Sequence, residues 1–143
     1  MRALLINIEG LEPMDETADT GTDRSGSFRY FIILLLAGLL VVYHVSMLFD
    51  LVQGKGLSSD PGFNAIQAIF RLAIVASLIA VSMGKRIALW AMWGSIAGLV
   101  ATQYWAHFGN LPVEFTEGRH PLSYLKGFIF PTIITAASLY RRR

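Results

Sequence analysis

A few ionisable and amide side chains lie inside or at the edges of long apolar segments of this 143-residue chain. The candidates for a shared polar pocket are His44, Asp50, Arg71, Gln103, His107 and Lys126. An imidazole can transfer protons, and a guanidinium can stabilise an anionic group. The residue types therefore indicate either acid–base catalysis or recognition of an anionic or polar ligand. The sequence contains no GxSxG, HExxH, CxxC or glycine-rich phosphate motif, so whether the protein is an enzyme stays open.

Arg71 is the most informative of these residues, because it interrupts an apolar segment. A charge in the hydrocarbon of a bilayer costs at least about 2.5 kcal/mol, so we expect Arg71 to face other helices and to find a partner there. Asp50 is the partner that we predict. The depths of Asp50 and Arg71 along their helices differ by roughly 7–8 Å, which an extended arginine side chain can bridge. The pair would fix two helices together, or Arg71 would be the charge of a ligand site.

Metal and haem sites are the alternative use of the histidines. His44 and His107 differ in level by roughly 6–9 Å, which is awkward for axial haem ligation. A second set of imidazole and carboxylate groups comprises His107, Glu114, Glu117 and His120, whose chemistry suits Zn²⁺ or Cu²⁺. That set lies around a loop without fixed periodicity, and the chain has no cysteine. We therefore predict no metal site and no cofactor.

Four apolar segments must position these side chains. They cover residues 30–52, 65–83, 87–109 and 122–140. Each is long enough to cross a hydrocarbon core of about 30 Å as a helix, and backbone groups in lipid must be satisfied within the segment. Helices of a soluble bundle would carry a charged outer stripe, which these segments lack. The sequence predicts an all-α, integral membrane four-helix bundle over residues 30–143.

Composition supports the same class. Hydrophobic residues make up 54% of the chain and charged residues 15%, with a mean hydropathy of +0.51. Soluble domains average about 45–50% and about 25%, respectively. The balance excludes a nucleic-acid binder built on basic patches, a disulfide-stapled module and a wholly disordered chain. Lipid is the predicted surrounding, and no nucleic acid is expected as a partner.

The distribution of basic residues predicts the orientation. If all four segments span, eight basic residues fall on one side: Arg2, Arg24, Arg29, Lys85, Arg86 and Arg141–Arg143. Only Lys55 and Arg119 lie in the opposite loops. The positive-inside rule then places both termini in the cytoplasm, by default of a multi-pass protein in a bacterial inner membrane. Residues 1–29 are polar and rich in Asp, Glu, Thr, Gly and Ser, and we predict that they are mobile.

The third segment carries a possible contact surface. Gly94 and Gly98 form a GxxxG step, which lets two helix backbones approach closely in a bilayer. The step serves either a contact within the bundle or a homodimer or other protein partner. The helix count, together with a histidine near the end of the third segment (Trp105-Ala106-His107-Phe108), is similar to the DoxX-like family of small four-helix membrane proteins. This resemblance implies a layout and no residue roles.

Three functions fit these observations. The first is an accessory or interaction subunit of a membrane assembly, favoured by small size and the GxxxG step. The second is a membrane enzyme or ligand-binding protein whose pocket opens in the outer leaflet. The third is a small dimeric transporter, which the position of Asp50 near a segment end disfavours, because such exporters need a carboxylate near mid-depth.

Overall fold

The described part of the chain is all-helical. The computed structural model describes residues 20–109, 111, 113 and 116–140, with side chains from residue 26 onward. Four α-helices occupy it: α1 (Thr20–Val52), α2 (Pro61–Ser82), α3 (Ile87–Phe108) and α4 (Ile129–Leu139). A 3-10 helix, η2 (Pro121–Phe128), leads directly into α4. The predicted all-α class is confirmed, since the described residues are 83% helical and contain no strand.

The first predicted boundary shifts. Helix α1 begins at Thr20, so residues 20–29, which we predicted to belong to a mobile leader, extend the first apolar segment as helix. Residues 1–19 of that predicted leader lie outside the described residues. Helix α2 also begins earlier than its apolar segment, because Asp60 caps it by accepting a hydrogen bond from Gly62 N at 2.9 Å. Pro61 then occupies the first helical position, where its missing N–H is no loss.

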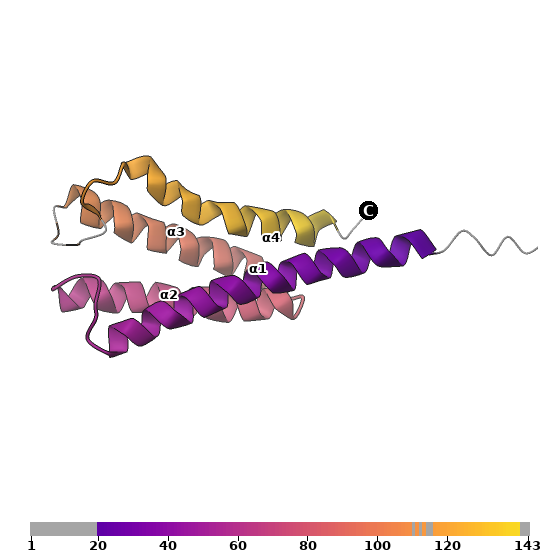
Figure 1. Ribbon diagram of the computed structural model, residues 1–143, viewed down its shortest axis with the longest axis horizontal. Coiled ribbons are helices and arrows are strands. Elements are labelled where there is room, and N and C mark those ends of the chain that lie inside the picture. Colours follow the sequence, from indigo (N-terminus) through magenta and orange to yellow (C-terminus); the bar gives the residue numbers. More distant parts are fainter. Residues whose placement is uncertain (1–19, 110, 112, 114–115, 141–143) are drawn as a thin grey trace, which may run out of the picture.

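The helical bundle has two ends, a loop end and a turn end (Figure 1). The loop end holds the α1–α2 loop and the start of η2, and the turn end holds the α2–α3 turn and the last residues of α4. Gly84 adopts a positive φ of 81° and makes that turn short, so α2 and α3 are antiparallel neighbours, as predicted. Helix α2 packs against both α1 and α3, around a core that includes Ile74, Leu78 and Met92.

The outer surface of the bundle is apolar. Only 11% of the most apolar stretch of α1 is buried, and large side chains such as Val42, Phe49 and Ile87 are exposed. Three helical segments are long and apolar enough to cross a membrane: Gly26–Val52, Pro61–Ser82 and Pro121–Leu139. Helix α3, the remaining predicted span, is as long as α2 but is not among these three. Length and composition therefore support three of the four predicted spans.

The fourth segment is not one regular α-helix. Its first part is the 3-10 helix η2, and the change to α geometry falls at Phe128, shortly before Pro131. Proline lacks the N–H that an α-helix would donate to the carbonyl four residues earlier, and its ring crowds that carbonyl. A 3-10 helix has three residues per turn, so residues three apart lie above one another. This geometry stacks Ser123 with Lys126 on one side of η2.

Candidate functional site

A cavity of about 620 Å³ lies between the helices toward the loop end. Helix α1 contributes Tyr43, His44 and Met47 to its wall, and α2 contributes Arg71. Gln103 of α3 and Lys126 of η2 close it from the other side. Four of the six candidate pocket residues thus line one cavity (His44, Arg71, Gln103 and Lys126), whereas Asp50 and His107 are not among its lining residues.

Arg71 is the centre of a buried polar network that joins three helices. Its side chain is only 2% exposed. Its guanidinium donates to Gln67 Oε1 at 3.3 Å and lies 3.4 Å from His44 Nδ1. Gln67, which is fully buried, donates through Nε2 to Thr102 Oγ1 at 2.6 Å. The network orients the guanidinium between α1, α2 and α3 and restricts its movement.

The charge of Arg71 has no described counter-ion. Its partners Gln67 and His44 are polar, and the Tyr43 side chain also lies close enough to interact with the guanidinium. No Asp or Glu occurs among the described residues that line the cavity, whereas Arg119 and Lys126 add two further cations. The cavity is therefore cationic, and an anion inside it would lower the electrostatic cost of burying Arg71.

Two buried polar atoms of residues that line this cavity have no hydrogen-bond partner in the described part of the chain. They are Nε of Arg71 on α2 and Oγ of Ser123 on η2. Buried polar groups are nearly always hydrogen-bonded, so each such atom in a cavity points to a ligand group or a water that completes it. An oxygen-rich anion between α2 and η2 would accept hydrogen bonds from both.

Asp50 is not the partner of Arg71 that the sequence predicted. The described residues show no ion pair between the two, and the guanidinium bonds to His44 and Gln67 instead. The reason is helical geometry. Asp50 follows His44 by six residues, which turns it by about 120° around α1 at about 100° per residue. Once His44 faces Arg71, Asp50 points elsewhere and remains half-buried near the end of α1.

His107 has a different environment from His44. Its Nδ1 lies 3.2 Å from the Tyr124 hydroxyl, and the two rings meet edge to face. Tyr124 also packs against Tyr104, so this aromatic group attaches η2 to α3. His44 and His107 thus bind separate partners rather than facing one another. The described residues contain no cluster of three or more metal-ligating side chains, and Glu114 of the second histidine set lies outside them.

The two glycines of the GxxxG step have unlike surroundings. A Cβ on Gly98 would run into the ring of Phe70, so this glycine allows α2 to pack closely on α3. A Cβ on Gly94 would meet nothing within 4 Å, and Gly94 is exposed. Gly98 therefore serves a contact inside the bundle, while Gly94 leaves bare backbone on the surface of α3.

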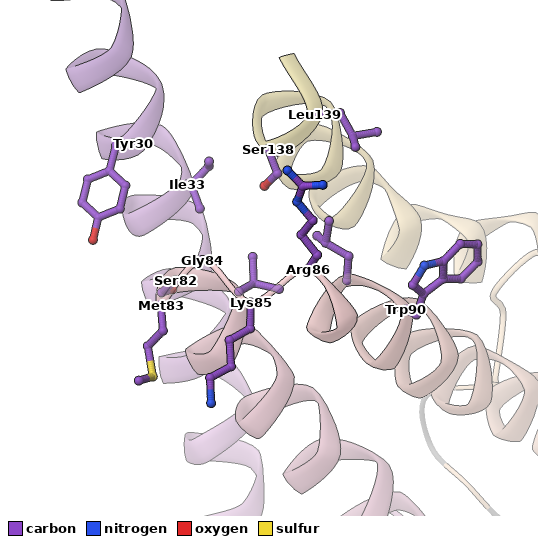
Figure 2. Close-up of a pocket in the computed structure, with 12 residues that line it drawn as sticks. Tyr30, Ile33, Ser82, Met83, Gly84, Lys85, Arg86, Trp90, Ser138 and Leu139 are labelled. Carbon is purple, nitrogen blue, oxygen red and sulfur yellow. The ribbon is translucent and has the colours of Figure 1, made fainter. Parts of the chain in front are cut away.

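A second cavity, of about 660 Å³, lies at the turn end. Residues of all four α-helices and of the α2–α3 turn line it, including Ile33, Arg86 and Ser138. Figure 2 shows the side chain of Arg86 extending toward Ser138 on α4, whereas that of the neighbouring Lys85 runs away from α4. The sequence identified these two residues only as topology signals.

Sequence reasoning missed several residues of the first cavity. Thr102, which receives the hydrogen bond from Gln67, carries no signal of its own, because threonine is common in membrane helices. Arg119 had been placed in an outer loop, and Ser123 in a regular α-helix. The spacing of Gln67 and Arg71, four residues apart, does place both on one face of α2, and this part of the network follows from the sequence.

Comparisons with known proteins add no assignment. No family model, curated protein or solved structure matches this chain. The similarity to the DoxX-like family therefore stays at the helix count and the position of His107, and no residue role is transferred from it.

Proposed function

We propose that this protein is an integral membrane four-helix bundle that binds an anionic amphiphile in the cavity at its loop end. In this proposal both termini are cytoplasmic, and the loop end lies in the outer half of the membrane. The basic residues of the sequence, which are concentrated at the turn end and the termini, support that orientation. The exposed apolar surfaces of α1, α2 and α4 support the bilayer as surroundings.

The observation that carries the proposal is the buried, hydrogen-bonded Arg71 without a described carboxylate partner. An ionisable residue inside a membrane bundle is costly and marks a functional site by default. If Arg71 only filled space in the bundle, an apolar side chain of similar volume would make the fold more stable than a buried charge does. A bound anion explains both the retained charge and the two unpartnered atoms, Arg71 Nε and Ser123 Oγ.

The lining changes character with depth and favours a ligand with a head and a tail. Polar and cationic side chains, such as Gln103, Ser123 and Lys126, lie nearer the loop end. Leu40, Ile74 and Ile96 line the same cavity. Each of them lies closer to the turn end than the polar lining residue of its own helix. An outer-leaflet lipid has the same polarity, with its head outward and its chain inward. The volume of about 620 Å³ is in the range of pockets for small ligands, which favours one hydrocarbon chain over two.

Binding is better supported than catalysis. Ser123 is the aliphatic hydroxyl among the described lining residues, and its Oγ has no hydrogen-bond partner there, so no described base activates it as a nucleophile. His44, the imidazole at the cavity, is held against Arg71 through Nδ1. These contacts orient a cation toward a ligand and provide no nucleophile–base pair.

The test is a binding measurement on the full chain in mild detergent. The probes are lysophosphatidic acid, palmitate and, as a zwitterionic single-chain control, lysophosphatidylcholine. We expect the two anions to bind and Arg71→Met to weaken them by at least about tenfold, since hydrogen bonds to charged groups contribute about 1.5–3 kcal/mol. Lys55→Gln is the matched control, because this exposed lysine in the α1–α2 loop does not line the cavity. Equal binding of anionic and zwitterionic probes would contradict the proposal.

The orientation can be tested separately, because the chain has no cysteine. Single cysteines replacing Lys55 and Lys85 would be labelled in intact cells by a membrane-impermeant maleimide. Labelling at position 55 but not at position 85 is the expected result. The opposite pattern would place the cavity in the cytoplasmic half and contradict this part of the proposal.

A role as an accessory subunit is the second candidate, and the surroundings of Gly94 favour it. This glycine exposes helix backbone on the surface of α3, where a partner helix could approach closely. Chemical crosslinking in native membranes followed by purification tests it: a partner at fixed stoichiometry that is lost in Gly94→Leu supports this function. An unchanged partner or a monomer argues against Gly94 as the contact.

A further inference from the structure

The cavity at the turn end is separate from the proposed ligand site and has its own charge. Its described lining contains Lys85 and Arg86 but no Asp or Glu. The hydroxyl of Ser138 adds a hydrogen-bond donor on α4. Guanidinium and hydroxyl groups on facing walls are the groups that bind phosphate oxygens. Charge complementarity thus indicates a phosphate-bearing occupant.

The rim of this cavity is apolar and aromatic. Trp90 is 79% exposed and Leu139 is 59% exposed, and Met83 at the end of α2 is also exposed. Tryptophan at the end of a membrane helix marks the headgroup level of the bilayer. A free phosphate ion has no apolar part that could contact this rim. A phospholipid can place its headgroup among the cations and its acyl chains along the rim.

We infer that the turn-end cavity binds the headgroup of an anionic phospholipid of the adjacent leaflet, with Arg86 as its main contact. Arg86 extends toward Ser138 across the space between α3 and α4 (Figure 2). Arg29, another cation near this end, is already engaged: its guanidinium lies 4.4 Å from the centre of the Tyr140 ring and donates to the Tyr140 carbonyl oxygen. This contact links α1 to the end of α4 beside the cavity.

Lys85 and Arg86 provide a matched pair of variants. They are neighbours with equal charge, but their side chains point in opposite directions (Figure 2). A diffuse attraction of the basic end to an anionic membrane surface would weaken equally in Lys85→Gln and Arg86→Gln. A headgroup site with Arg86 as its contact weakens only in Arg86→Gln.

The experiment uses the full chain purified from nanodiscs of equal phosphatidylglycerol and phosphatidylcholine. Native mass spectrometry counts the lipids that stay bound. We expect retained phosphatidylglycerol to exceed phosphatidylcholine and to fall at least about fivefold in Arg86→Gln, with Lys85→Gln close to wild type. Arg86→Lys, which keeps the charge, should retain most of the binding. Adding inorganic phosphate at millimolar concentration should not displace the lipid.

Three results would overturn the inference. The first is equal loss in both glutamine variants, which would indicate diffuse surface attraction. The second is no preference for phosphatidylglycerol in the wild type. The third is displacement by inorganic phosphate, which would identify a soluble anion as the occupant. Because Arg86 does not line the loop-end cavity, Arg86→Gln should leave palmitate binding there unchanged, so the two sites can fail independently.

Discussion

Replacing Arg71 by methionine should remove ligand binding while leaving the free energy of unfolding within about 2 kcal/mol of that of the wild type. Methionine keeps an unbranched side chain that reaches as far as Nε of arginine, and it removes the rest of the guanidinium with its charge. Taking an arginine out of the centre of a membrane helix lowers the insertion cost by about 2.5–3.5 kcal/mol. A buried side chain that served only stability would not show this dissociation of binding from stability.

The opposing effect comes from Gln67. It is fully buried, and its Oε1 accepts a hydrogen bond from the Arg71 guanidinium at 3.3 Å. In Arg71→Met that oxygen loses its partner, which costs about 1–3 kcal/mol. The two effects are of similar size, so the single variant should be nearly neutral. The double variant Arg71→Met/Gln67→Leu removes the unpaired amide as well and should be more stable than the wild type, because Thr102 keeps its bond to the Leu99 carbonyl at 2.6 Å.

Denaturant unfolding in detergent micelles, followed by near-ultraviolet circular dichroism, measures the stabilities, and the lysophosphatidic acid assay measures binding on the same samples. Loss of binding with retained stability in both variants is the expected result. If Arg71→Met lowers the free energy of unfolding by more than about 3 kcal/mol, Arg71 is a structural clamp rather than a ligand group. Full retention of anion binding would refute the role of Arg71 directly.

Two further predictions concern the fold. Gly98→Ala should be less stable than Gly94→Ala by about 1–3 kcal/mol in the same unfolding assay, because the new methyl group meets the Phe70 ring only at Gly98; equal stabilities would show that α2 and α3 do not pack closely there. Asp60→Ala should cost about 1 kcal/mol by removing the cap of α2, whereas Ser59→Ala, one residue earlier and exposed, should cost almost nothing; a neutral Asp60→Ala would mean that the cap is not formed.

The length and periodicity of the apolar segments were sufficient to predict the helices. The cost of unsatisfied backbone groups in lipid forces helices, so a count of apolar residues predicts them. The short α2–α3 joint was also correctly predicted to make antiparallel neighbours, since Gly84 accepts a positive φ that other residues avoid. The start of α2 was missed, although the Asp60–Pro61 pair is a typical helix start.

The site was harder to predict, because a helical-wheel projection of a single helix does not show how that helix is rotated relative to its neighbours. The difference in depth along the helices favoured Asp50 as the partner of Arg71, and His44 was predicted only as another residue of the pocket. The rotation of α1 in the bundle turns His44 inward, and at about 100° per residue this moves Asp50 aside. Ser123 came to the cavity through the 3-10 geometry of η2, which no hydropathy pattern predicts, because the pattern of apolar residues is compatible with an α-helix too.

The two proposed sites use the same chemistry at different depths, and this difference has a functional consequence. Arg86 lies at the beginning of α3, which the proposed orientation places at the headgroup level, so a lipid bound there would exchange without leaving the leaflet. Arg71 lies about 15 Å along α2 from Pro61, which is at the loop end. In the proposed orientation this depth is well below the headgroups of the outer leaflet. An anion that reaches Arg71 must leave the headgroup region and lose its hydration, and only a compensating cation makes that favourable. We therefore propose that the loop-end cavity selects a ligand and retains it, whereas the turn-end cavity binds lipids of the surrounding leaflet.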